Sequence, residues 1–276
     1  MVQSQHQYGF THNRSISDAS RVVIDTLQEA NRRRTPIIIL STDFSSAFDS
    51  ITFEHLENVM RIFNFPQKII EATMKMVNGT YSIEVNGQKA EDENLLASSG
   101  QGDPKSAGLF NIAVAPLNHL LASHPAILRD AVPVFFADDD LLPLDGSNIE
   151  AILDLIEKIK EYEMVSGLRL NTGKCEFIAN FVGLDDIRRL SERSGMQHVE
   201  SLRHLGIIIN NKGQMTHELN IAPIETALGQ ISDRISRMHS TPIGQSIYTK
   251  YLLSSKMVHI IAQMSDQPAL KISRKS

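Results

Sequence analysis

Residues 132–146, VPVFFADDDLLPLDG, set three aspartates, Asp138, Asp139 and Asp140, between two short apolar runs. Two such runs joined by so few residues predict a tight antiparallel hairpin with the acids at its tip or beside it. Neighbouring carboxylates make one another harder to ionise. At about 4 Å, two unit charges repel by roughly 1 kcal/mol in water and about 4 kcal/mol at an effective dielectric near 20. The hairpin tip therefore requires a cation, shared protons or a nearby basic group.

A second buried strand brings another carboxylate. Residues 35–44, TPIIILSTDF, have four consecutive apolar residues after Pro36, which predicts a strand buried on both faces and ending near Asp43. If this strand lies beside the hairpin, Asp43, Asp138 and Asp139 project from one edge of one sheet. Oxygen ligands without a Cys or His cluster favour Mg²⁺ or Mn²⁺. A solvated acidic turn is the alternative, because Asp is common in turns.

The rest of the chain predicts the α+β class. Apolar residues at helical spacing predict helices over 15–33, 52–63, 67–77, 104–123 and 148–166, the last ending at Gly167. Residues 80–95 alternate around Asn86-Gly87, which predicts a hairpin, and short strands are expected near 174–180 and 203–213. Helical sequence follows from about His217. This order predicts an antiparallel sheet with helices on one face.

Charge is distributed unevenly along the 276 residues, whose net charge is −5. Residues 230–276 hold seven Lys or Arg against two acids, which leaves +5 on this segment and −10 on the rest. An acidic body with a basic segment suits a metal site beside an anion-binding arm, although a solvated basic helix face explains the charge equally well.

Three absences bound the expected location of the protein. It has one cysteine, Cys175, no secretory signal and no run of about 18 apolar residues. We therefore expect an intracellular protein, nuclear or cytoplasmic, without a membrane partner. Cys175 is expected to be a buried strand residue, because no His partner lies near it in the sequence.

The sequence resembles a known polymerase family at six blocks in the family's order. FADD at 136–139 resembles the box of reverse transcriptases, particularly those of non-LTR retrotransposons and group II introns. The other blocks are QYGFTHNRSISD (7–18), STDFSSAFDSI (41–51), SSGQGDPKSAGLFNIAVAPL (98–117), SGLRLNTGKCEF (166–177) and RHLGI (203–207). One four-letter box is weak evidence, whereas the ordered set is specific.

The resemblance implies a right-hand polymerase fold. It places partial fingers over 1–35, a palm over 36–200 with an inserted finger-like hairpin near 80–98, a primer-grip-like hairpin over 201–215, and a partial helical thumb over 216–276. The implied activity is that of an RNA-directed DNA polymerase, a nucleotidyltransferase that adds dNTPs to a DNA primer on an RNA template by two-metal phosphoryl transfer.

The same resemblance implies roles for individual residues. Asp43 and Asp138 would bridge two Mg²⁺ ions, with Mn²⁺ as the other suitable cation, and Asp139 would assist. Lys174 would donate a proton to the departing pyrophosphate. Residues expected at the nucleotide or template are Phe44, Phe48, Gln101, Gly102 and Arg14.

Structural roles remain open for some of these residues. Phe48, which would select against a nucleotide 2′-hydroxyl, could equally be a core ring, and Lys174 a surface lysine. Arg14 has an ion pair with Asp18 or Asp49 as its alternative.

Departures from the family's pattern support a second interpretation. Much of the fingers segment that normally precedes the Q-x-G-F block is expected to be missing. Lys105, Ala107 and Gly108 stand where Leu, Pro and Leu are usual. The alternative is thus a truncated, non-catalytic nucleic-acid-binding relic, which the intact acidic residues oppose. An RNA-templated RNA polymerase is a third interpretation, which Phe48 disfavours, and the sequence indicates no oligomeric state.

Asp140 is the last departure, because an uncharged residue usually follows the acidic pair. Strand alternation would turn it away from Asp139. We therefore predict that Asp140 contributes charge near the site but does not bind a metal.

Overall fold

The computed structural model describes residues 4–78, 80–81, 84–86, 88–89, 93–94, 105–237, 241–248 and 250. Its centre is a five-stranded sheet in the order β6–β7–β1–β8–β9. The strands are β1 (Ile37–Thr42), β6 (Val134–Phe136), β7 (Asp139–Asp145), β8 (Glu176–Asn180) and β9 (Gln197–His198). β1 pairs antiparallel with β7 and β8, whereas β9 runs parallel to β8. The predicted strand after Pro36 is therefore confirmed as the middle strand.

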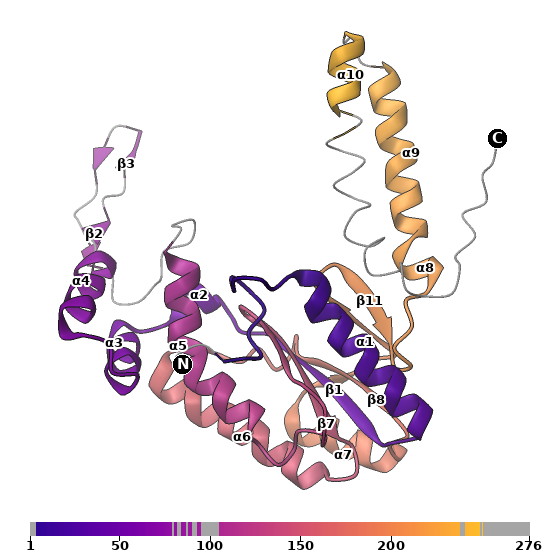
Figure 1. Cartoon of the computed structure of the whole chain (residues 1–276), viewed down its shortest axis with the longest axis horizontal. Coiled ribbons are helices and arrows are strands. Elements are labelled where there is room, and N and C mark those ends of the chain that lie inside the picture. The colour runs from indigo at the N-terminus through magenta and orange to yellow at the C-terminus, as the bar shows by residue number, and fades with distance from the viewer. Residues whose placement is uncertain are drawn as a thin grey trace.

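Both faces of this sheet are covered. On one face, Ile38 and Leu40 of β1 pack in the core with α3 (Phe53–Ile62), α5 (Ser106–Ala122) and α6 (Ile149–Ser166). On the other face, Ile37 and Ile39 pack with α1 (Ile16–Arg33) and the hairpin of β10 (Ser201–His204) and β11 (Ile207–Asn210). Figure 1 shows α1 on the side of the sheet opposite to α5 and α6. The predicted α+β palm is confirmed, with two corrections. β9 joins the otherwise antiparallel sheet in parallel with β8, and helices lie on both faces, because α1 has an apolar stripe of its own to bury.

Helix ends follow the capping residues of the sequence. Ser15 and Asp18 form a capping box at the start of α1. α6 begins after Asn148, whose side chain accepts a hydrogen bond from Ala151 N–H, and ends at Gly167, whose φ is 86°. A Cβ at Gly167 would lie 2.2 Å from Ser50 O, so the turn to the next segment requires glycine.

Between β1 and α5 the chain forms short helices and two small strand pairs. The helices are α2 (Ala47–Ser50), α3 and α4 (Gln67–Val77). β2 (Thr80–Tyr81) pairs with β5 (Glu93–Asn94), and β3 (Glu84–Val85) pairs with β4 (Gln88–Lys89). The hairpin predicted around Asn86 is confirmed, while its expected continuation at Leu95 and the expected helix start at Asp103-Pro104 lie outside the described residues.

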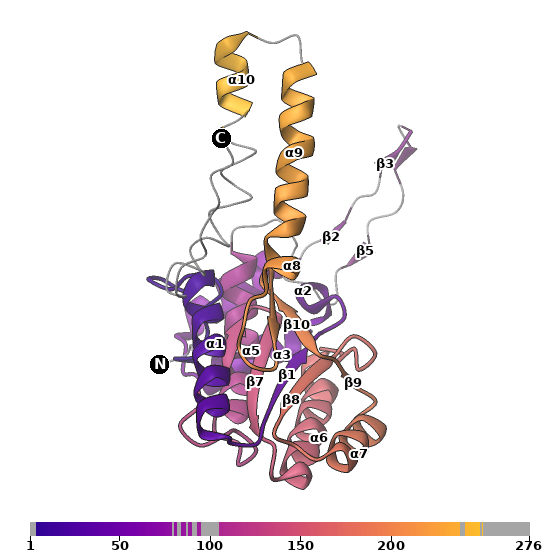
Figure 2. The same cartoon turned by 90° about the vertical axis from the view of Figure 1, so that its right-hand side faces the viewer.

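The C-terminal helices project away from the sheet. They are α8 (His217–Asn220), α9 (Ala222–Arg237) and α10 (Pro242–Tyr248), which confirms the helical sequence predicted from about His217. Figures 1 and 2 show α9 and α10 side by side, extending in the same direction as the β2–β5 arm. Two of the described helices were not predicted, the short α2 and α7 (Leu184–Ser194). α7 packs on α6 and ends at Gly195. Among the residues described, no helix has the length and apolar character needed to cross a membrane.

Candidate active site

β1 brings Asp43 to one edge of the sheet. The strand ends at Thr42, and the half-buried Asp43 follows directly. Its backbone is held on both sides: the carbonyl accepts a hydrogen bond from Asn171 N–H (2.8 Å), and the N–H donates to Cys175 Sγ (3.4 Å). Cys175 is fully buried as expected, and burial raises the pKa of its thiol to about 11. The neutral sulfur therefore supports the backbone of Asp43 and is no nucleophile.

The β6–β7 hairpin brings two more carboxylates to the same edge. Phe136 pairs with Asp139, so Ala137 and Asp138 form the turn between the strands. Ala137 has a φ of 61°, a left-handed conformation that costs an L-residue roughly 1–2 kcal/mol. Because Thr42 lies opposite Asp140 in the β1–β7 pairing, the hairpin turn and Asp43 are neighbours. The expected meeting of strand end and hairpin tip is what the structure shows.

The three carboxylates share one electrostatic environment. Partial burial is the main cause that raises the pKa of Asp138; its own backbone N–H opposes this rise, and the charge of Asp43 adds to it. The pKa of Asp139 is also raised, first by burial and then by the charges of Asp138 and Asp43. The charge of Asp43 thus makes ionisation of Asp138 less favourable, and the charges of Asp138 and Asp43 do the same to Asp139. A cation between them would reverse this effect.

This donor set fits a divalent cation that keeps open coordination positions. Mg²⁺ is usually bound by one or two carboxylates and completed by water and substrate phosphates. Carboxylate oxygens, as carried by Asp43, Asp138 and Asp139, are the ligand type that Mg²⁺ prefers. Over the described ranges, no group of three or more His, Cys, Asp or Glu residues is arranged so that it could hold a metal ion.

Asp140 lies on the opposite face of β7. It pairs with Phe135 and Thr42, and directly opposed residues of paired strands point to the same face, which here is the core side beneath α5. Its side chain is 3% exposed, and its Oδ1 has no hydrogen-bond partner. Burial, followed by the charges of Asp139 and Asp138, raises its pKa well above the ordinary value. The predicted turn away from Asp139 is confirmed, whereas the raised pKa of this buried carboxyl opposes the charge that was predicted for it.

The two aromatic residues expected at the nucleotide are placed differently. Phe48 is half-buried and stacks on Phe110 of α5, with ring centroids 4.4 Å apart and ring planes 22° apart. Phe44 is 7% exposed and belongs to the core, with its backbone bridged to Leu170. Phe48 is therefore only partly covered by the core, whereas Phe44 is buried in it. Their roles at a nucleotide stay predictions.

Lys174 lies on a turn next to Asp43. Lys174 is exposed on the turn from Asn171 to Cys175, the two residues that hold the Asp43 backbone. Arg14 lies over the ring of Tyr8, 4.7 Å from its centroid. The Asp18 carboxylate, one of its two suggested ion-pair partners, instead accepts hydrogen bonds from Ser15. Gln101 and Gly102 lie outside the described residues.

Sequence reasoning missed two buried polar residues beside the hairpin turn. Gln7 is 1% exposed, and its Oε1 accepts a hydrogen bond from Ala137 N–H (3.3 Å). Asn111 of α5 is 4% exposed and donates to Gly9 O (2.9 Å). Gln7 is the first residue of the Q-x-G-F block, so the sequence showed the residue but not its role. Its contact lies 130 residues along the chain, which no local pattern could indicate.

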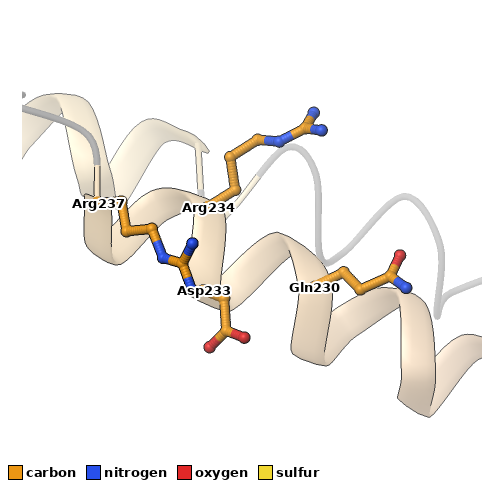
Figure 3. A pocket seen from close by; sticks show the side chains of 4 residues that line it. All are labelled: Gln230, Asp233, Arg234 and Arg237. Atoms are coloured by element: carbon orange, nitrogen blue, oxygen red, sulfur yellow. The ribbon is translucent and has the colours of Figure 1, made fainter.

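α9 carries a polar concave surface away from the carboxylates. Its side chains Gln230, Asp233, Arg234 and Arg237 line an open pocket of about 490 Å³ (Figure 3). Two of these residues are arginines, whose guanidinium groups suit phosphate oxygens.

Known proteins resemble this chain over most of its length. The Retrovirus-related Pol polyprotein from type-2 retrotransposable element R2DM of Drosophila melanogaster is 27% identical over 174 residues, covering 61% of this chain and 16% of that protein. The corresponding polyprotein from type-1 retrotransposable element R2 of Nasonia vitripennis is 22% identical over 228 residues, covering 75% of this chain and 22% of that protein. The chain therefore spans about a fifth of the length of these curated relatives.

Solved structures show the same fold at lower identity. Apo telomerase from Candida tropicalis has a TM-score of 0.57 at 12% identity, covering 95% of this chain and 47% of that one. Telomerase from Candida albicans, in complex with a fragment of telomeric RNA, has a TM-score of 0.52 at 13% identity, covering 95% and 45%. The family model described as Reverse transcriptase (RNA-dependent DNA polymerase) matches residues 1–209. These matches confirm the resemblance drawn from the six sequence blocks: the chain belongs to the reverse transcriptase family, with relatives among the Pol polyproteins of R2 non-LTR retrotransposons.

Proposed function

We propose that this chain performs RNA-templated addition of deoxynucleotides to the 3′-hydroxyl of a DNA primer, with Mg²⁺ as its metal. The observation that carries the proposal is the position of three carboxylates, those of Asp43, Asp138 and Asp139, at one edge of the sheet. A metal-free protein gains nothing from their mutual repulsion. A metal-dependent polymerase uses the same field to attract divalent cations.

Asp43 and Asp138 would hold two metal ions, and Asp139 would assist them. When bound, such ions activate the primer hydroxyl and neutralise the charge of the triphosphate. The chain's own contribution is then mainly positioning. The backbone of Asp43 is tied to Asn171 and Cys175, so this carboxylate would keep its place as the substrate enters.

Three further residues would act on the nucleotide. The half-buried ring of Phe48 would contact the sugar and exclude a 2′-hydroxyl. Lys174 would donate a proton to the departing pyrophosphate from the turn beside Asp43. Arg14, with its guanidinium held over Tyr8, would contact the template or the triphosphate.

The nucleic-acid partners would be an RNA template and a DNA primer. Arg234 and Arg237 on the concave surface of α9 would contact their phosphates. The measurable signature of such contacts is an affinity that falls as salt concentration rises.

The test is primer extension on an RNA template with dNTPs and Mg²⁺, comparing the wild-type chain with Asp138→Asn. Asp185→Asn is the matched control, because Asp185 is an exposed aspartate in the first turn of α7, away from the carboxylate edge. We expect extension by the wild type and by Asp185→Asn, and its loss in Asp138→Asn. Equal extension by Asp138→Asn and the wild type would contradict the proposal.

Nucleic-acid binding without synthesis is the second candidate function. It is favoured by the finding that, in the described part of the chain, no group of three or more His, Cys, Asp or Glu residues could hold a metal ion. Salt-sensitive binding of an RNA–DNA duplex by the wild type, together with no extension, would support this candidate over the first.

A further inference from the structure

An N-terminal segment forms an edge strand beside the hairpin that carries the carboxylates. Tyr8 N–H donates to Phe135 O (2.7 Å), and Phe135 N–H donates to His6 O (3.0 Å). Gln7 and Phe135 form the parallel bridge between these bonds. Residues 6–8 therefore lie alongside β6, at the edge of the five-stranded sheet, joined to it by this single bridge.

The Gln7 side chain reaches from this edge strand to the turn itself. Its Oε1 accepts hydrogen bonds from Gly9 N–H (3.0 Å) and Ala137 N–H (3.3 Å). Both partners are backbone donors, so the oxygen of the amide must point toward them. The Gln7 side chain thus holds the Phe136–Ala137 peptide unit, at the start of the turn that carries Asp138.

Two neighbours make this contact specific to the site. A Cβ at Gly9 would lie 2.7 Å from Ala137 N and 3.0 Å from Phe136 C, so only glycine allows the edge strand to approach the turn this closely. On the other side of Gly9, the side-chain amide of Asn111 in α5 donates a hydrogen bond to the Gly9 carbonyl oxygen (2.9 Å). The edge strand is thereby held between α5 and the turn.

The turn needs such support because of its own conformation. Ala137 adopts a φ of 61°, and strained backbone persists where surrounding contacts overdetermine it. Without an acceptor for its N–H, Ala137 would lose a hydrogen bond that stabilises this left-handed conformation. A relaxed turn would move Asp138 relative to Asp43.

We propose that Gln7 is a positioning residue of the metal site: its Oε1 fixes the Ala137 peptide so that the Asp138 carboxylate faces Asp43. The inference rests on the proposed metal-dependent function and assigns to Gln7 a role beyond packing. The unpartnered Gln7 Nε2 is not needed for this role, since only Oε1 contacts the turn.

The test uses the full chain and two substitutions at one position. Gln7→Met keeps the side-chain length and removes the oxygen acceptor, whereas Gln7→Glu keeps an oxygen there. Ser194→Ala is the control, because it also removes a buried side-chain hydrogen bond (2.7 Å to Leu190 O) but lies in α7. The readouts are amide hydrogen exchange at Ala137, the dissociation constant for Mn²⁺, and the melting temperature.

We expect Gln7→Met to lose protection of the Ala137 amide and to raise the Mn²⁺ dissociation constant by about 10-fold or more, the usual effect of losing a group that orients a metal ligand. Gln7→Glu should retain protection and bind Mn²⁺ no more weakly than the wild type. Ser194→Ala should change the melting temperature alone.

Unchanged Mn²⁺ affinity in Gln7→Met, or unchanged exchange at Ala137, would overturn the role of Gln7 while leaving the proposed function intact. A wild-type chain that binds no Mn²⁺ would overturn both, and is distinguished by that measurement.

Discussion

Replacing Asp140 by leucine is expected to stabilise the protein without impairing synthesis. The Asp140 side chain is 3% exposed, and its Oδ1 has no hydrogen-bond partner. It faces the core with Phe135 and lies opposite Thr42, whose Oγ1 is also buried without a partner. The acid therefore occupies a position that suits an apolar side chain.

The expected gain in the free energy of unfolding follows from removing a buried polar group that has no hydrogen-bond partner. An unpartnered buried polar group costs about 1–3 kcal/mol. Leucine and aspartate have equally many side-chain heavy atoms and the same branching, so the change in packing should cost less than about 1.5 kcal/mol and is offset by buried apolar surface. We expect a net gain near 2 kcal/mol, or a melting temperature higher by about 4–8 °C for a chain of this size.

Thermal and urea unfolding of the wild type, Asp140→Leu and Asp140→Asn measure this gain. Asp140→Asn keeps a buried polar group and should gain less than Asp140→Leu. Primer extension by Asp140→Leu should match the wild type, because Asp140 points away from the metal-binding edge. A less stable Asp140→Leu protein, or one as inactive as Asp138→Asn, would refute this account of the three aspartates.

Three further predictions concern other parts of the molecule. Burial lowers the pKa of His204 to about 4, whereas in the unfolded chain this pKa is near 6.5, so the unfolded chain binds more protons than the folded one between pH 6.5 and pH 4. The free energy of unfolding should therefore fall by up to roughly 3 kcal/mol as pH drops from 6.5 to 4. Melting curves of His204→Phe should lack this loss. Phe48→Ala should admit ribonucleotides in primer extension, and Phe110→Leu, which removes the ring stacked 4.4 Å away, should do so more weakly. Arg234→Ala and Arg237→Ala should each lower duplex affinity and reduce the salt slope by about 0.9 per lost phosphate contact, while unchanged slopes would argue against α9 as a phosphate contact.

Local patterns predicted the elements that bear the site. The four apolar residues after Pro36 identified β1, and the apolar runs around the acids identified the β6–β7 hairpin, because both signals depend only on neighbouring residues. α7 was missed because its burial depends on α6: in this helix only Leu190 and Ser194 are buried, too few for an apolar stripe to stand out. The helix on the second face, α1, was predicted as a helix, but its side of the sheet depends on tertiary packing.

The roles of single residues could be predicted only where the residue type alone determines the chemistry. Three carboxylates at strand ends indicated a cation whatever the details of packing. The burial of Phe44 and of Asp140 could not be predicted in the same way, because each is set by which face of β1 or β7 meets α5. Strand alternation correctly predicted that Asp140 turns away from Asp139. The rise of its pKa could not be predicted, because it follows from burial in a core that forms only in the folded chain.

The backbone on either side of the candidate metal site is held by residues far away in sequence. Cys175 Sγ accepts the N–H of Asp43 from 132 residues away, and Gln7 Oε1 accepts the N–H of Ala137 from 130 residues away. Neither contact involves a carboxylate, so neither competes with a metal for its ligands. The repulsion among Asp43, Asp138 and Asp139 would spread an unsupported turn and strand end apart. These two anchors oppose that spreading through neutral groups, which lets the carboxylates remain close enough to attract a cation and still leave their oxygens free to bind it.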